Sequence, residues 1–270
     1  MGDREVLAVI PARRASSRLP DKVLVDLGGW PLVRWVWEQA RMARRIDRVV
    51  IAVDDDEVAA CCRAFGAEVC PTSVDHASGT DRIAEVAAQG AADIVLSVQA
   101  DEPFMDPHTL DALVDALDRD REIGIATPVC RLMDPASFLD PSVVKVVFDE
   151  RGRALYFSRA PIPWPRDEAT AAQGPAPVGA WRHLGVYAYR RDALFAFAAT
   201  PPGTLERIER LEQLRALARG MPIGTVVVSE PVGPGVDTPD DLRVARALVA
   251  RGIRAPGRST ASGSALPVAD

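Results

Sequence analysis

The sequence predicts an α/β fold in which helices cover a largely parallel sheet. Short apolar runs alternate with longer amphipathic stretches through the first half of the chain, and this alternation is typical of parallel strands joined by helices. The 270 residues, 48% of them hydrophobic, can bury a full core. They fit one large domain, or a major domain with a smaller insertion.

The first half of the chain supplies most of the expected sheet. Val6–Ile10 predicts a short buried strand, because the run is branched, nearly continuous and bounded by Pro11. A helix over residues 32–44 follows, since Pro31 suits the first turn of a helix. The same patterns predict a strand at 48–53, a helix at 57–65, a helix at 82–88, a strand at 94–98, a helix at 108–117 and a strand at 123–129.

The pattern changes after Pro128. Residues 143–149 and 153–157 predict a hairpin that turns at Arg151 and Gly152. The remaining predicted elements are a strand at 183–189, a helix at 204–219, a strand at 225–228 and a closing helix at 239–249.

Two further segments lack a regular pattern. Residues 161–177 are too rich in Pro, Ala and Gly to be regular, which predicts an exposed or flexible loop. Residues 254–270 are small and polar with no period, so we expect them to be disordered. The helix at 204–219, by contrast, has one clear apolar face, made of Leu205, Ile208, Leu211, Leu214 and Leu217.

Composition excludes several classes of protein. The formal net charge of −6 argues against a general nucleic-acid binder, and no run approaches the roughly 20 apolar residues of a membrane span. Asp3 and Glu5 precede the first apolar run, unlike the order in a signal peptide, so we expect a cytoplasmic protein. The four cysteines are Cys61, Cys62, Cys70 and Cys130, and they form no CxxC pair, so neither a zinc site nor a redox site is indicated.

A cationic loop follows the first strand. Arg13, Arg18 and Lys22 are spaced along it, and separated cations can neutralise different phosphates and the charge on a leaving pyrophosphate. Ligands bind beyond the carboxyl ends of parallel strands, so we expect a polyphosphate here rather than a merely solvated basic turn. The loop lacks GxxxxGK[ST], so it is not a Walker A loop. It also lacks GxGxxG, which disfavours a dinucleotide oxidoreductase.

A second candidate motif is the turn Ser78-Gly79-Thr80. Its small side chains and accessible amides precede a helix expected to begin at Arg82. Such a turn can hydrogen-bond a base or a ribose, with Gly79 permitting close approach. It can equally be a helix cap formed by Thr80 or Asp81, and the two roles are compatible.

Two distant aspartates complete the candidate chemistry. Asp101 lies in the segment Gln99–Pro103, at the end of the predicted strand 94–98, and Asp237 precedes the last helix. A carboxylate at a strand end facing a polyphosphate loop is where Mg²⁺ would be held. The alternatives are that Asp101 is a turn or cap residue and that Asp237 is a helix cap.

Taken together, these and later segments resemble the 3-deoxy-manno-octulosonate (Kdo) cytidylyltransferases, or CMP-Kdo synthetases, over about residues 6–252. The matching segments are PARRASSRLPDK, DHASGTDR, VQADEP, VVKVVFDERGRALYFSRAPIPW, RHLGVYAYR, LERIERLEQLR and GVDTPDDL. The resemblance implies a nucleotide-diphospho-sugar transferase-like fold with a Rossmann-like sheet. It also implies a nucleotide-binding core at 1–130 and 221–253, and a smaller sugar-acid-binding and dimerisation subdomain at 131–220.

The resemblance also implies a role for each matching residue. The triphosphate would meet Arg13, Arg18 and Lys22. The cytidine would be held by Ser78, Gly79, Arg82 and Gln99, and Mg²⁺ by Asp101 and Asp237. The sugar-acid pocket would be lined by Arg159, His183, Tyr187, Glu212 and Gln213. The residues alone favour a solvated helix face for Glu212 and Gln213, and a structural role for His183.

The implied reaction is a nucleotidyl transfer. The anomeric hydroxyl of the sugar acid attacks the α-phosphorus of CTP in line and expels pyrophosphate, with Arg13, Lys22, Asp101 and Asp237 as the catalytic residues. The expected partners are CTP, a small sugar acid and a second copy of the chain, in a cytoplasmic homodimer that serves lipopolysaccharide biosynthesis. We expect neither nucleic acid nor membrane insertion.

The chain departs from the family pattern at three places. Asp21-Lys22-Val23 replaces Gly-Lys-Pro, Ala100 replaces Gly in the QxDEP turn, and Trp30 replaces a basic or polar residue. Asp21 puts an anion beside Lys22, and Ala100 would tolerate a positive φ poorly. Two alternatives therefore stay open, namely a cytidylyltransferase for an amino-sugar acid or a phosphonate, and a nucleotide-binding paralogue that no longer catalyses.

Overall fold

The computed structural model describes residues 4–14, 16, 18–76, 78–166, 179–229 and 231–253. Within them, ten strands form one mixed sheet in the order β5-β4-β1-β6-β11-β7-β10-β8-β9, with β12 also paired to β7. These strands are β1 (Val6–Ala12), β4 (Arg48–Val53), β5 (Glu68–Pro71), β6 (Ile94–Ser97), β7 (Ile125–Arg131), β8 (Lys145–Phe148), β9 (Ala154–Ser158), β10 (Trp181–His183), β11 (Tyr187–Arg190) and β12 (Ile223–Val227).

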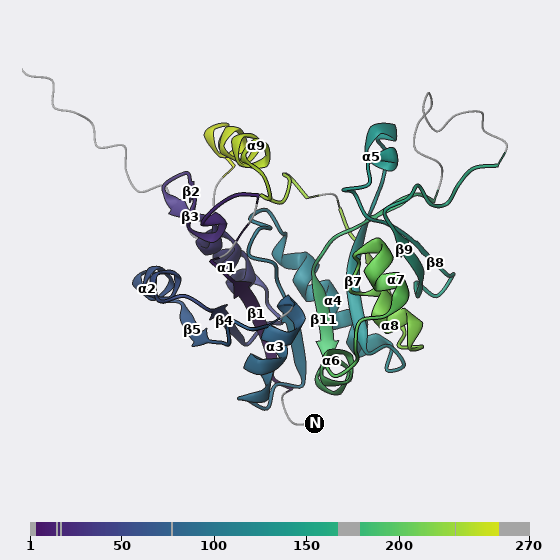
Figure 1. Cartoon of the computed structure of the whole chain (residues 1–270), viewed down its shortest axis with the longest axis horizontal. Helices are drawn as coiled ribbons and strands as arrows, with labels where there is room; N and C mark the ends of the chain where they lie inside the picture. Colours follow the sequence, from purple (N-terminus) through teal and green to yellow (C-terminus); the bar gives the residue numbers. More distant parts are fainter. Residues whose placement is uncertain are drawn as a thin grey trace, which may run out of the picture.

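The sheet is parallel on one side and antiparallel on the other. Strands β5, β4, β1 and β6 run parallel, and β12 runs parallel to β7. Strand β11 runs antiparallel to both β6 and β7, and β8 pairs antiparallel with β9. Figure 1 shows β5, β4 and β1 at one side of the molecule and β8 and β9 at the other, with β11 and β7 between them. The predicted α/β class is confirmed.

Helices and short elements join the strands. They are η1 (Lys22–Leu24), β2 (Asp26–Leu27), β3 (Trp30–Pro31), α1 (Leu32–Met42), α2 (Asp56–Ala64), α3 (Gly79–Ala88), α4 (Pro107–Arg119), α5 (Pro135–Leu139), α6 (Arg191–Ala198), α7 (Thr204–Glu209), α8 (Leu214–Ala218) and α9 (Pro239–Ala250). Helix α9 lies near β2 and β3 in Figure 1, and its Leu242 and Ala245 are buried in one cluster with Leu27 and Trp35. None of the described helices is both long and apolar enough to cross a membrane.

Strand β1 is buried on both of its faces. Val6, Ala8 and Ile10 pack with side chains of α1, α2 and α4, whereas Leu7 and Val9 pack with side chains of α3, α6 and α8. Because neighbouring side chains of a strand point to opposite faces, a strand covered on both sides needs a continuous apolar run. The unbroken apolar sequence of this strand therefore follows from its place inside the parallel part of the sheet.

Most predicted elements are confirmed, including the hairpin, which is formed by β8 and β9. The predicted strand at 183–189 is two strands, because β10 and β11 pair with different stretches of β7 and are separated by residues 184–186. Strand β5 and helices α5 and α6 were not predicted from the sequence. Residues 167–177 of the expected loop and the expected disordered tail at 254–270 lie outside the described residues. The division into core and subdomain stays a prediction, since one sheet runs through both ranges.

The single helix predicted at 204–219 is wrong. Helix α7 ends at Glu209, Arg210 adopts a left-handed conformation with φ 52° and ψ 48°, and α8 begins at Leu214. Ile208 is 73% exposed, so only the second half of the apolar face enters the core. The spacing of the leucines continues through the break. The chain nevertheless turns at Arg210, between the exposed first half and the buried second half of the apolar face. Residues 212 and 213 consequently lie in a turn rather than on a helix face.

Lys145, at the start of β8, has a fully buried side chain. Its Nζ donates hydrogen bonds to the backbone oxygens of Asp140 at 2.8 Å, Val143 at 2.6 Å and Arg159 at 2.6 Å. Burial lowers the pKa of Lys145, although the charge of Asp140 acts in the opposite direction. Three loop carbonyls are thus gathered around one ammonium group, which fixes the backbone beside β8 and β9.

The substitution Lys145→Met is expected to lower the free energy of unfolding by about 3 kcal/mol, because a buried polar group left without a partner costs roughly 1–3 kcal/mol. Urea unfolding measures the change. Arg151→Met, in the exposed hairpin turn, is the matched control and should change stability by no more than about 0.5 kcal/mol. Equal effects of the two substitutions would contradict the role assigned to Lys145.

Candidate active site

Three adjoining cavities run along one end of the sheet. We call them the large cavity, of about 720 Å³, the middle cavity, of about 260 Å³, and the small cavity, of about 190 Å³. Gln99 lines all three, whereas Arg18, Asp101 and Asp237 line both the large and the middle cavity. Arg13 lines the middle and the small cavity. Because they share these walls, the cavities form one continuous site.

Every residue that the sequence singled out for the site lines at least one of these cavities. The large cavity contains, besides the shared residues, Arg159, His183, Tyr187, Glu212 and Gln213. The middle cavity adds Lys22, and the small cavity adds Ser78, Gly79 and Arg82. The structure therefore brings the predicted residues together, while the role of each stays a prediction.

Lys22 lies at the centre of the middle cavity. Its Nζ is 2.6 Å from Asp101 Oδ2 and 2.8 Å from Asp237 Oδ1, and Arg18 contacts the other oxygen of Asp237 at 3.0 Å. Burial alone would lower the pKa of Lys22, but the two carboxylates outweigh it and raise that pKa. Burial would likewise raise the pKa of Asp237, yet Lys22 and Arg18 lower it. Lys22 and Asp237 are therefore both charged at neutral pH.

Backbone contacts place Asp237 beside Asp101. The N–H of Val236 donates to the backbone oxygen of Asp101 at 2.8 Å, and the Val236 side chain is fully buried under α9. A Cβ on Gly235 would come within 2.9 Å of Glu102 Oε1, so a larger residue there would displace the end of the Glu102 side chain. Thr238, not Asp237, caps α9. The carboxylate of Asp237 is therefore left to face the middle cavity.

Asp101 and Asp237 form a donor set that fits a hard cation. Carboxylate oxygens are the ligands that Mg²⁺ prefers, and Mg²⁺ usually keeps only one or two protein carboxylates beside water and substrate phosphates. In the part of the chain that the structure describes, no cluster of three or more His, Cys, Asp or Glu could hold a metal alone. The position of the Lys22 ammonium between the two carboxylates shows that a cation is favoured there.

Two of the three departures from the family pattern have a local explanation. Asp21 has φ 51°, a left-handed conformation that glycine adopts freely and Asp tolerates better than most residues. Its carboxylate accepts a hydrogen bond from Arg14 Nε at 3.0 Å, so a cation pairs with it. The expected strain at Ala100 is wrong, because Asp21 and Arg210 are the described non-glycine residues with positive φ.

The small cavity lies at the N-terminus of α3. Ser78 caps this helix and forms a capping box with Asp81, so the helix begins at Gly79, three residues earlier than predicted. The expectation that Thr80 or Asp81 is the cap is wrong, although Asp81 completes the box. A Cβ on Gly79 would meet only Pro11, at an ordinary 3.8 Å. Its missing side chain thus leaves room in the cavity rather than relieving a clash with the protein.

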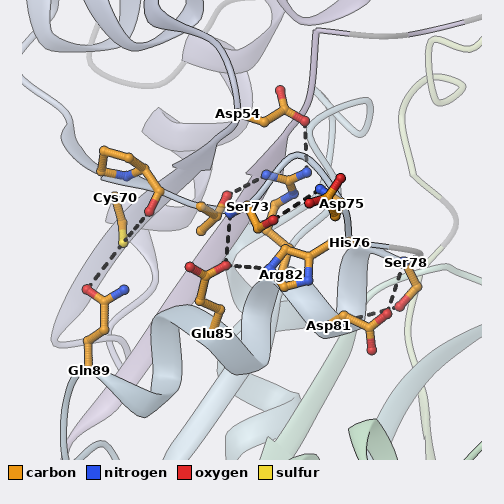
Figure 2. A network of polar contacts seen from close by, with 12 residues as sticks. Asp54, Cys70, Ser73, Asp75, His76, Ser78, Asp81, Arg82, Glu85 and Gln89 are labelled. Carbon is orange, nitrogen blue, oxygen red and sulfur yellow. Dashed lines mark hydrogen bonds and ion pairs between the residues drawn. The ribbon is translucent and has the colours of Figure 1, made fainter.

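Figure 2 shows how α3 holds the wall of the small cavity. Arg82 is buried and pairs with Asp54 at 2.8 Å, and it also hydrogen-bonds the Thr72 hydroxyl. Glu85 accepts from the backbone N–H of Ser73 and contacts His76, and the hydrogen bond with His76 lowers the pKa of Glu85. The loop at 72–76 is therefore fastened to α3, with Arg82 serving chiefly as its anchor.

The fold constrains two side chains of the large cavity, because it keeps His183 neutral and fixes the position of Arg159. His183 is 9% exposed, and its Nε2 lies 2.9 Å from the Thr127 hydroxyl. Burial, aided by the charge of Arg182, lowers the pKa of His183 to about 3. Arg159 donates from Nε to the Glu209 carbonyl at 2.8 Å and from a terminal nitrogen to the Pro141 carbonyl at 2.9 Å. Anchored by carbonyls, Arg159 keeps its positive charge available to an anion.

Sequence reasoning missed several cavity residues. Glu102 is half-buried beside Asp101, and desolvation, together with the Asp101 charge, raises the pKa of Glu102 to about 7. Arg182, Arg210 and Tyr189 also line the large cavity. Glu102 and Arg182 lie inside the matched segments VQADEP and RHLGVYAYR, which was the one available signal. Arg210 reaches the cavity because the backbone turns at that residue, and no local pattern predicts the turn.

His183 gives a pH-dependent stability. Its folded pKa of about 3 lies below an unfolded value of about 6.5, so the unfolded chain binds the proton first on acidification. The stability conferred by neutral His183 is therefore complete above about pH 6.5 and is lost towards pH 3, at about 1.4 kcal/mol per pH unit. Urea unfolding from pH 7 to 4.5 should show a smaller slope in His183→Gln. His108→Gln, exposed on α4, should keep the wild-type slope, and equal slopes in all three proteins would contradict the assignment.

Comparison with known proteins agrees with this geometry. A family model described as cytidylyltransferase matches residues 7–223. The 3-deoxy-manno-octulosonate cytidylyltransferase of Syntrophotalea carbinolica is 49% identical over 239 residues, which is 88% of this chain and 95% of that protein. The protein of the same name from Marinobacter nauticus is 47% identical over 253 residues, or 90% of this chain and 97% of that protein.

Solved structures give the same result. CMP:2-keto-3-deoxy-manno-octonic acid synthetase, complexed with CTP, superposes with a TM-score of 0.85 at 40% identity, covering 92% of this chain and 100% of that chain. The 4-diphosphocytidyl-2C-methyl-D-erythritol synthase of Anaerococcus prevotii, at a TM-score of 0.60 and 12% identity over 92% of this chain and 99% of that chain, shares the fold alone. On the family model and on relatives of nearly half identity over most of its length, the chain belongs to the 3-deoxy-manno-octulosonate cytidylyltransferase family.

Proposed function

We propose that this protein joins CTP to Kdo, giving CMP-Kdo and pyrophosphate. The observation that carries the proposal is the ammonium of Lys22 held between Asp101 and Asp237, where the large and middle cavities meet. Relatives that carry this activity in their names match along nearly their whole length, and the similar solved synthetase is a complex with CTP.

The three cavities suit the three parts of the reactants. The small cavity, with Ser78 and Gly79 at the start of a helix, suits the cytidine, and the middle cavity, with Arg13, Arg18 and Lys22, suits the triphosphate. The large cavity suits the sugar acid, since its volume is in the range of small-molecule sites and Arg159 offers a cation to a carboxylate.

The chemical step is an in-line displacement. A bond forms between the anomeric oxygen of Kdo and the α-phosphorus of CTP, and the bond from that phosphorus to the bridging oxygen breaks as pyrophosphate leaves with its electron pair. The hydroxyl proton passes to solvent. Arg13 and Lys22 stabilise the charge that grows on the pyrophosphate, while Gln99, which lines all three cavities, orients the reacting groups.

Asp101 and Asp237 would hold Mg²⁺ at the junction of the cavities. Bound there, Mg²⁺ supplies charge neutralisation for the phosphate and lowers the pKa of a coordinated hydroxyl. Lys22 would then have two sets of partners. In the chain alone it is the counter-ion of both carboxylates, and once the metal and nucleotide are present it would bind a phosphate. Its flexible stem and compact ammonium suit such a change of partner.

We further propose that the enzyme is a cytoplasmic homodimer in lipopolysaccharide biosynthesis. Support for the dimer comes from large apolar side chains that are exposed in the region assigned to dimerisation, namely Met133, Leu139, Leu155 and Trp164. Large apolar side chains left exposed in one region are a feature of interaction surfaces when they gather into a patch. Support for the location and the pathway comes from the proposed substrates, a cytoplasmic nucleotide and a lipopolysaccharide sugar.

The acceptor is tested by pyrophosphate release from CTP over a panel of acids in magnesium buffer. We expect rapid release with Kdo and little with a sialic acid or a phosphonate, because the large cavity combines Arg159 with the buried neutral His183. UTP and ATP replace CTP as controls. Release with another acid and none with Kdo would change the assigned acceptor, and tight CTP binding without release from any acid would indicate a paralogue that does not catalyse.

The metal role is tested by Asp101→Asn. We expect turnover to fall at least about a thousandfold, since a charged group acting on the transition state is removed, while urea unfolding still shows a cooperatively folded protein. Asp26→Asn, an exposed carboxylate on β2 outside the cavities, is the matched control and should keep wild-type turnover. A near wild-type rate for Asp101→Asn in magnesium buffer would refute the metal role.

A further inference from the structure

Thr80 links two parts of the site that are far apart in the sequence. It is the second residue of α3 and is 5% exposed. Its hydroxyl donates a hydrogen bond to Glu212 Oε2 at 2.7 Å, across 132 positions of the chain. This bond joins the N-terminus of α3 to the turn between α7 and α8.

The two ends of this hydrogen bond belong to different cavities. Ser78 and Gly79, directly before Thr80, line the small cavity, whereas Glu212 lines the large one. The first turn of α3 therefore presents two residues to the proposed cytidine site and sends the next side chain to the wall of the proposed acceptor site. A shift of this turn is transmitted to the Glu212 carboxylate through one bond.

Among the described residues, Glu212 also pairs with Arg215, over a longer distance than its contact with Thr80. Arg215 reaches Glu212 Oε1 at 3.4 Å, but it is committed to Glu206, which it contacts at 2.9 and 2.5 Å. The short contact of Glu212 is the one with the Thr80 hydroxyl. Without that donor, the Glu212 carboxylate is free to swing from the cavity wall towards Arg215.

Two tyrosines, the buried Tyr189 and the partly buried Tyr187, are affected by the charge of Glu212. Burial raises the pKa of Tyr187, and the charges of Tyr189 and Glu212 raise it further. Burial and Glu212 likewise raise the pKa of Tyr189, while a hydrogen bond with Thr80 acts in the opposite direction. Thr80 is thus the polar contact shared by Glu212 and Tyr189 at the boundary between α3 and β11.

We propose that Thr80 is a positioning residue that fixes the Glu212 carboxylate for the acceptor and so couples the nucleotide end of the site to the acceptor end. The inference rests on the proposed function and deepens it. Thr80 itself touches neither the reacting atoms nor the phosphates. It acts through Glu212, and its effect should therefore appear in acceptor binding and disappear when Glu212 is removed.

The test compares Thr80→Val, which keeps the shape and removes the donor, with Thr80→Ser, which keeps the donor. We expect Thr80→Val to raise the KM for Kdo about tenfold, as for loss of a hydrogen bond to a charged group, and to change the KM for CTP less than threefold. Thr80→Ser should stay within about twofold of wild type for both substrates. Thr109→Val, a threonine buried to the same degree in the first turn of α4, is the matched control and should leave both constants unchanged.

A double substitution separates positioning from a structural effect. In the Glu212→Ala background, Thr80→Val should add little to the KM for Kdo, because the carboxylate oxygen that accepts the Thr80 hydrogen bond is gone. Full additivity of the two substitutions, an unchanged KM for Kdo in Thr80→Val, or failure of Thr80→Ser to restore it would overturn the inference.

Failure of the proposed function is distinguishable from failure of this inference. If wild-type protein releases no pyrophosphate from CTP with Kdo, the proposed function fails. The hydrogen bond is then tested by a urea-unfolding cycle over wild type, Thr80→Val, Glu212→Ala and the double variant, which needs no substrate. A non-additive cycle would support the link between α3 and the α7–α8 turn, and an additive one would overturn it.

Discussion

The ion pairs of Lys22 with Asp101 and Asp237 are the constraint on which the rest of the site depends. They tie together the loop after β1, the end of β6 and the segment before α9. The chain has only two lysines among its 32 cationic residues, and the second, Lys145, gathers three carbonyls. A compact ammonium carries three donors that can converge on several oxygens, and both lysines lie where separate segments of the chain meet.

Strand β7 organises the acceptor side in a similar way. Strands β11 and β10 pair with different stretches of it, and β12 pairs with it in parallel. The gap between β10 and β11 brings the rings of His183 and Tyr187 to 5.4 Å between centroids. Because burial keeps His183 neutral, the cationic groups that line the large cavity are its arginines, Arg159 among them. The arrangement favours an anionic acceptor.

Much of the fold could be predicted, because β1 and β6 carry continuous apolar runs and most helices have a clear period. The failures have physical reasons. The leucine period at 204–219 is unbroken, yet Leu205 and Ile208 stay exposed while Leu211, Leu214 and Leu217 pack against the core, and the chain turns at Arg210. The cap of α3 was misplaced because Ser78, Thr80 and Asp81 are all suited to capping, and only the backbone decides that Ser78 and Asp81 form the box.

Local patterns and short motifs were enough to predict the class of fold, the family and many, though not all, of the residues that line the site. Tertiary structure alone decided which of these residues touch. These contacts depend on the pairing of segments up to 215 positions apart. They include the ion pairs of Lys22 with both aspartates, the pairing of Asp21 with Arg14, and the hydrogen bond of the Thr80 hydroxyl. Such contacts arise from sheet order and helix packing, which no single stretch of sequence encodes.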